Sequence, residues 1–141
     1  MIVTVSHVNT ATALELVSSA FEFAATKEWK IAVCVVDAAG ATVASARMDG
    51  VSSQTLTFAE DKAFTAATMR RSTAAFFDRM DQSPSLRLGI ANRDRLLVWG
   101  GGVPVKFEGS IVGGIGVSGA QDFEDVACAQ EALRCVGLAW E

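Results

Sequence analysis

Apolar residues recur along this chain at two different spacings. Where they stand three or four positions apart, they line one face of a helix. In the first such segment, the apolar face is predicted to consist of Leu14, Val17, Phe21 and Ala24. On this pattern we predict helices over about residues 9–27, 53–70, 73–80 and 122–136.

Other apolar runs are short, rich in β-branched residues and typical of strands. Residues 31–36 are apolar throughout, which predicts a strand buried on both faces. Residues 37–40 are turn-forming, so residues 41–48 are predicted to return as the second strand of a hairpin. Residues 81–94 are predicted to form a loop, because they contain a proline and a glycine. Three further strands are predicted at residues 95–99, 103–107 and 110–117.

These segments predict the fold class. Their order is α-β-β-α-α-β-β-β-α, and the connections between neighbouring strands are too short for parallel crossovers. We therefore expect an α+β fold in which a central five-stranded antiparallel sheet is flanked by helices. The length of 141 residues suits one domain spanning residues 1–141.

Composition and charge narrow the classes of function. The net charge of −4 excludes a generally basic nucleic-acid binder and offers nothing that an anionic membrane would attract. No apolar run approaches the 18 residues that predict a membrane span. Half of the residues are apolar and the mean hydropathy is +0.32, which favours a homo-oligomer that covers apolar surface between subunits.

The three cysteines indicate a reducing compartment. Cys128 and Cys135 stand two helical turns apart, too far for a disulfide, and Cys34 lies in a predicted strand. We expect reduced thiols in a cytoplasmic protein, and the first ten residues do not resemble a secretory signal.

A run of three glycines is the most informative candidate for ligand binding. Gly100, Gly101 and Gly102 precede Pro104 between two predicted strands, and packing alone explains their entropic cost poorly. Their backbone amides could line a concave ligand site. A flexible turn explains the same residues, and the sequence leaves both explanations open.

Four charged residues near the predicted hairpin and on the second helix are also candidates. Arg47 and Asp49 project to the same face of an extended strand, where they form either an ion pair or a clamp for a ligand carboxylate. Lys62 follows Asp61 on the predicted helix, and small residues at Ala63 and Ala66 leave room beside its ammonium. Lys62 is therefore either a solvated surface lysine or a group that moves a proton.

His7 is the only histidine, and the chain contains no tyrosine. Haem iron usually takes His, Cys, Met or Tyr, so the available axial ligands are His7, the cysteines and the methionines. Alternatively, His7 is a surface histidine that binds no ligand. Hydrolase chemistry of the Ser/His/Asp or Cys/His type is disfavoured, because every such set would need this single histidine.

Several motifs in order resemble the GlcG/HbpS-like family over about residues 8–138. They are VVDAAG at 35–40, RMDG at 47–50, KA at 62–63, GGGVP at 100–104, GGIGVSG at 113–119 and ED at 124–125. The resemblance implies a sandwich with a central antiparallel sheet and oligomers that are often octameric. It also implies that some relatives bind haem or promote its breakdown. The positions that match the motifs include Arg47, Asp49, Lys62, the three glycines with Pro104, Ser118 and Glu124.

Two classes of function follow from these candidates. The first is binding of haem or a related tetrapyrrole, with Arg47 or Lys62 at the propionates and His7 or a methionine at the iron. The second is a small catabolic enzyme, an isomerase, tautomerase or hydrolase acting on an oxidised organic acid. In that enzyme Arg47 would hold a carboxylate, Lys62 or Asp61 would move a proton, and the glycine amides would stabilise an oxyanion. Both predict that Arg47, Lys62 and the glycines surround one hollow, whereas a structural accessory subunit would have none.

Overall fold

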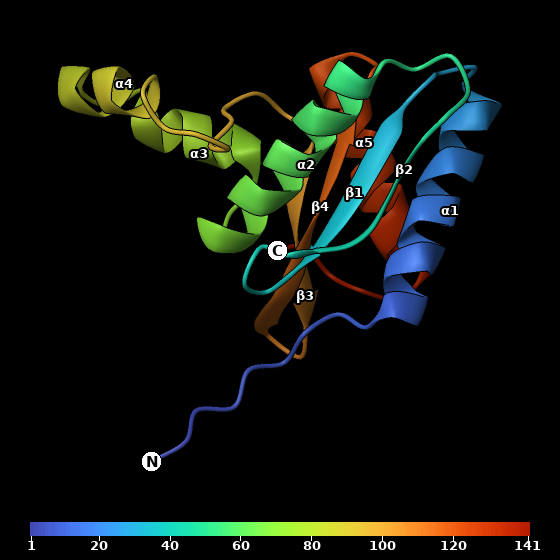
Figure 1. Ribbon diagram of the computed structural model, residues 1–141, viewed down its shortest axis with the longest axis horizontal. Coiled ribbons are helices and arrows are strands. Elements are labelled where there is room, and N and C mark those ends of the chain that lie inside the picture. Colours follow the sequence, from blue (N-terminus) through green and yellow to red (C-terminus); the bar gives the residue numbers. More distant parts are fainter.

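The computed structural model describes residues 1–141 as five helices and four strands (Figure 1). The first half of the chain contains α1 (Thr10–Thr26), β1 (Ala32–Asp37), β2 (Thr42–Arg47), α2 (Ser53–Thr68) and α3 (Thr73–Met80). The second half contains α4 (Pro84–Ile90), β3 (Gly102–Phe107), β4 (Ser110–Ser118) and α5 (Asp122–Cys135). No helix combines the length and the apolar character needed to cross a membrane.

The four strands form one antiparallel sheet in the order β2-β1-β4-β3. α1 and α5 cover one face of this sheet and α2 covers the other, while α3 and α4 extend away from it (Figure 1). Alternate residues of β1 face the two layers, so Val33 and Val35 contact the α1 and α5 side while Cys34 and Val36 contact α2. The predicted strand buried on both faces is therefore confirmed.

α2 approaches the sheet so closely that it leaves no room for side chains between the two backbones. Gly114 and Gly116 of β4 lie under α2, where a Cβ atom would collide with the carbonyl oxygens of Ala63 and Ala59. Glycine on the strand and alanine on the helix thus permit close packing. This contact sets the position of every side chain that α2 carries.

The expected five-stranded sheet is wrong, because residues 95–99 do not form a strand. This segment bonds to a helix instead of a neighbouring strand: the Leu97 N–H donates to the Thr65 hydroxyl at 3.0 Å, and that hydroxyl donates to the Arg95 carbonyl at 3.0 Å. Leu97 is buried and the Trp99 ring packs edge-on against Phe58. The apolar run serves packing against α2 and not pairing in the sheet.

Two details of the helices also differ from expectation. The predicted loop at residues 81–94 contains α4, which begins after the cap residue Ser83 with Pro84 in its first turn and buries no residue. In α1 the buried face is formed mainly by alanines, so Leu14 is 56% exposed. The buried face of α1 contains Ala13 and Ala20 together with Leu16, and it packs against the sheet and α5.

Candidate functional site

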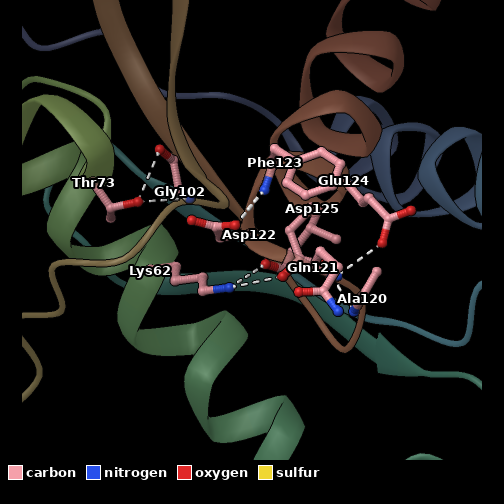
Figure 2. Close-up of polar contacts among 10 residues, drawn as sticks. Lys62, Thr73, Gly102, Ala120, Gln121, Asp122, Phe123, Glu124 and Asp125 are labelled. Atoms are coloured by element: carbon pink, nitrogen blue, oxygen red, sulfur yellow. Dashed lines mark hydrogen bonds and ion pairs between the residues drawn. The ribbon is translucent and has the colours of Figure 1, made fainter.

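A buried ion pair joins the two helical layers through the end of the sheet. The Lys62 ammonium of α2 donates to Asp125 Oδ2 of α5 at 3.0 Å and to the Val117 carbonyl of β4 at 2.8 Å (Figure 2). The side chains of Lys62 and Asp125 are only 1% and 3% exposed. The second carboxylate oxygen, Asp125 Oδ1, accepts from the Ala120 N–H at 3.0 Å. Protein groups therefore satisfy both charges.

The glycine triplet closes over this pair. Gly101 has a φ of +127° and lies so close to Lys62 that a Cβ atom would be 2.8 Å from Nζ. Gly102 lies against the Lys62 backbone and bonds to Thr73, whose hydroxyl accepts from the Gly102 N–H at 3.0 Å (Figure 2). Gly100 lines a separate hollow beside Trp99. The triplet and Lys62 thus meet by packing, without a hollow between them.

Burial dominates the electrostatics of the pair. It lowers the pKa of the Lys62 ammonium and raises the pKa of the Asp125 carboxyl, while the attraction between the two charges opposes both shifts. Neither residue lines any of the larger hollows. The pair connects α2, β4 and α5, and a substrate would have to displace the glycine backbone to reach the ammonium.

Two further predicted residues lie around the same end of the sheet. Ser118 ends β4, where it pairs with Ala32 of β1 and is 5% exposed. Glu124 Oε1 accepts from the Gln121 N–H at 3.0 Å and completes a capping box at the start of α5. Glu124 thereby holds the helix end that presents Asp125 to Lys62.

Arg47 lies apart from the Lys62 pair. It ends the edge strand β2, and β1 and β4 separate it from the glycine triplet that precedes β3. Its guanidinium donates to the Val51 carbonyl at 2.6 Å, and it lines a hollow of about 350 Å³ with Asp49 and Met48. The expectation of one hollow shared by Arg47, Lys62 and the glycines is therefore wrong.

Asp61 also points away from the Lys62 pair. Its carboxylate lies 3.9 Å from the Arg95 guanidinium, which in turn stacks 3.7 Å from the centre of the Phe64 ring. Burial raises the pKa of Asp61, and the charge of Arg95 opposes this rise. Asp61 is therefore ion-paired with the segment that follows α4 and not with its sequence neighbour Lys62.

His7 lines a hollow of about 440 Å³ whose walls are partly apolar and partly polar. The apolar part is formed by Val8, Phe107, Val112, Val136 and Leu138, and the polar part by His7, Ser6, Asn9 and Thr12. His7 Nδ1 accepts from the Ala38 N–H at 3.2 Å and lies 4.0 Å from Asp37 Oδ2. The segment is held in place, because the neighbouring Val8 is buried and its N–H donates to the Val112 carbonyl.

Asp37 divides its two oxygens between the turn and the histidine. Oδ1 accepts from the Ala39 and Ala41 N–H groups at 2.9 and 3.0 Å, whereas Oδ2 faces His7 without a hydrogen bond. A metal-bound histidine commonly donates its second ring N–H to a carboxylate. His7 is therefore a candidate metal ligand with a carboxylate beside its ring.

Two groups of residues near the candidate sites were not predicted from the sequence. Asp125 enters the sequence analysis only as part of the ED motif at 124–125, and no local pattern there indicates that its carboxylate meets Lys62. Arg70, Arg71 and Lys106 line a hollow of about 410 Å³ that also includes the predicted residue Pro104. The adjacent arginines at 70 and 71 were the available signal for that basic hollow.

Comparisons with known proteins agree with this fold. A family model described as haem-degrading protein HbpS-like matches residues 8–134. A 15.0 kDa protein of Citrobacter freundii, encoded in the dhaT-dhaS intergenic region, is 35% identical over 102 residues, which are 72% of each chain. Protein GlcG of Escherichia coli is 30% identical over 103 residues, covering 73% of this chain and 75% of GlcG.

Two solved structures are similar over nearly the whole chain. A double mutant of Streptomyces reticuli HbpS has a TM-score of 0.87 at 31% identity, covering 96% of this chain and 91% of HbpS. A PduOC–haem complex has a TM-score of 0.87 at 25% identity, covering 96% of this chain and 99% of PduOC. The antiparallel sheet with its flanking helices is thus an arrangement that solved relatives share.

Proposed function

Since this chain belongs to the haem-degrading protein HbpS-like family, we propose that it binds haem or a related tetrapyrrole in the hollow beside His7. The PduOC relative was crystallised with haem, which supports this class of ligand. The observation that carries the proposal is that the only histidine lines a hollow with five apolar residues. Apolar walls would bury the macrocycle, and the tetrapyrrole supplies the other nitrogen ligands of its iron.

Iron ligation requires a change of tautomer at His7. In the structure Nδ1 accepts from the Ala38 N–H, so a neutral imidazole carries its proton on Nε2. With the proton on Nδ1 instead, Nε2 would be free to hold the iron, and a small rotation of the ring would bring Nδ1 from 4.0 Å into hydrogen-bond distance of Asp37 Oδ2. The lost bond to Ala38 costs about 0.5–1.5 kcal/mol.

The cations named in the sequence analysis do not lie in this hollow. Lys62 is enclosed with Asp125, and Arg47 lines a different hollow. No lysine or arginine lines the hollow beside His7. We therefore expect the propionates of a bound haem to face solvent, and we expect weak dependence of haem affinity on ionic strength.

A haem titration tests the proposal. Wild-type protein should give a saturable shift of the Soret band, and His7→Ala should abolish or displace that shift because the axial ligand is lost. Asp94→Asn, which removes an exposed carboxylate elsewhere, serves as the control and should behave as wild type. A featureless titration of the wild-type protein would contradict the proposal.

A second variant tests whether the Asp37 carboxylate supports His7 as an iron ligand. Asp37→Asn keeps the side-chain oxygen that accepts from Ala39 and Ala41 but removes the negative charge beside His7. Its haem affinity should fall about 10- to 100-fold, the usual cost of losing such a partner of a metal ligand. An unchanged affinity would exclude Asp37 from this role.

The enzymatic alternative remains a prediction with less support. In that hypothesis Lys62 or Asp61 moves a proton for an oxidised organic acid held by Arg47. The enclosure of Lys62 and its separation from Arg47 argue for a structural role of the buried pair. Turnover of an organic acid that is lost in Arg47→Gln would restore the enzymatic hypothesis.

We also propose that the protein forms a homo-oligomer, for which an octamer is the expected size. Large apolar side chains remain exposed on the single chain, among them Phe77, Trp99 and Phe123. Self-association would cover such surface. Light scattering should give a mass several times 14.8 kDa; a mass equal to that of one chain would refute the proposal.

A cytoplasmic location is proposed from the cysteines. All three are free, and Cys34 and Cys128 are buried. Free thiols are typical of reducing compartments. Cell fractionation should find the protein with cytoplasmic markers, and recovery from an oxidising compartment would contradict this.

A further inference from the structure

We propose that the basic hollow beside the edge strand β3 is a second binding site, which takes a small aromatic carboxylate. Its cationic side chains belong to Arg70, Arg71 and Lys106, and its volume of about 410 Å³ lies within the range of small-molecule sites. The proposal is independent of haem binding, because none of its lining residues lines the hollow beside His7.

A specific contact holds the two sides of this hollow together. The Thr73 hydroxyl at the start of α3 accepts from the Gly102 N–H at the start of β3 (Figure 2). Thr73 is completely buried, so this bond fixes the connection between α2 and α3 against the sheet edge. Arg70 and Arg71 in that connection are thereby placed opposite Lys106 of β3.

The three cations are unpaired within the chain. Arg70, Arg71 and Lys106 have no ion-pair partner and no side-chain hydrogen bond, whereas Arg134 has a bidentate partner in Glu131. One acidic residue, Glu141, also lines the hollow. Three of the 12 cationic side chains thus gather in one place on a chain whose net charge is −4. This local excess of positive charge favours an anion.

The start of α3 reinforces this preference. Ser72 caps α3, and Ser72 and Ala74 line the hollow, so the positive end of the helix dipole faces it. The helix dipole therefore adds to the field of the side chains.

The apolar residues of the hollow favour an aromatic ring as the uncharged part of the ligand. Val103, Pro104, Val126 and Trp140 provide apolar surface, including one indole ring. An inorganic anion would leave this surface exposed to water, whereas an aromatic carboxylate places its ring on the wall and its charge at the cations. No histidine, cysteine, methionine or tyrosine lines the hollow, so an iron would find no usual axial ligand there.

Binding of 2-naphthoate, compared with the neutral 2-naphthamide, tests the charge requirement. In calorimetry the carboxylate should bind at least 10-fold more tightly than the amide, as expected for charge-assisted hydrogen bonds. The indole N–H signal of Trp140 should shift in the NMR spectrum on addition of naphthoate. Equal affinities for the two compounds would overturn the proposal.

Variants of the lining residues test whether naphthoate binds in the basic hollow. Arg71→Gln and Lys106→Gln should each weaken naphthoate binding about 10-fold or more. Arg79→Gln removes the same charge from the exposed last turn of α3, outside the hollow, and should change the affinity by less than 2-fold. Circular dichroism confirms that each variant is folded. An equal loss in Arg79→Gln would show that only net charge matters and would overturn the proposal.

Two further measurements separate the ligand classes and the sites. Trp140→Ala should weaken naphthoate binding and leave binding of inorganic phosphate unchanged; if naphthoate binds as well as before, the hollow is an inorganic-anion site and the proposal fails. His7→Ala should leave naphthoate affinity unchanged. A large loss in His7→Ala would place naphthoate in the other hollow and overturn the assignment.

Discussion

At the scale of single residues, the protein is organised around the enclosed pair of Lys62 and Asp125. The sequence shows Lys62 among alanines, which suggested open space beside its ammonium. In the structure that space is filled by Gly101, Val117 and Asp125. Asp125 lies 63 positions away, so no local spacing predicts the contact. The pair supports the positions of three elements at once.

Removing one member of the pair should destabilise the fold. Asp125→Ala leaves the Lys62 charge buried without its partner, so the free energy of unfolding should fall by about 3–5 kcal/mol in urea titrations. Asp122→Ala, at an exposed acid of the same helix, should cost about 1 kcal/mol or less.

The double variant Lys62→Met with Asp125→Leu tests whether the loss comes from the unpaired charge. It should recover most of the stability, because apolar replacements leave no buried charge. A double variant as unstable as Asp125→Ala would instead assign the loss to packing.

The cysteines give a pH-dependent prediction at the same scale. Burial raises the pKa of Cys34 from 9.0 to about 11 and that of Cys128 to about 12. Between pH 9 and 11 these thiols keep their protons in the folded state and lose them in the unfolded state, so stability should fall as pH rises through this range.

Thiol labelling checks the same environments. At pH 8 a disulfide reagent should modify the exposed Cys135 rapidly and the buried Cys34 and Cys128 only after denaturation. Rapid labelling of all three thiols in the native protein would contradict this account.

At the scale of elements, sequence spacing predicted those segments whose apolar residues face the core. β1 and α2 follow this rule. The rule fails at residues 95–99. This apolar run forms hydrogen bonds to Thr65 of α2 and not to a neighbouring strand, because apolar character does not reveal the hydrogen-bond partner. The rule also fails at α4, which buries no residue and therefore shows no periodicity.

The close contact between α2 and β4 can be tested by adding one methyl group. Gly116→Ala should lower the free energy of unfolding by about 1–3 kcal/mol, because the new Cβ would collide with the Ala59 carbonyl. Gly89→Ala in α4 has open space around it and should cause no loss. Thermal melts of both variants compare them, and equal stabilities would show that the helix can move away from the sheet.

At the scale of the whole molecule, the family and the antiparallel architecture could be inferred from the order of motifs. The grouping of the site residues could not, because it depends on which strands are neighbours. The order β2-β1-β4-β3 places Arg47 and the glycines at opposite edges. The hollow beside His7 and the basic hollow both adjoin β3, through Phe107 and Lys106, but they share no lining residue. The chain therefore has two hollows with different linings, for which we propose a haem and an organic anion.

A single histidine permits a direct test of the central claim. The protein can be produced with ¹⁵N-labelled histidine, loaded with ferric haem, and examined by pulsed electron paramagnetic resonance. We predict a hyperfine coupling between the iron and a ¹⁵N nucleus, which only His7 can supply. Haem bound without this coupling would contradict His7 as the iron ligand.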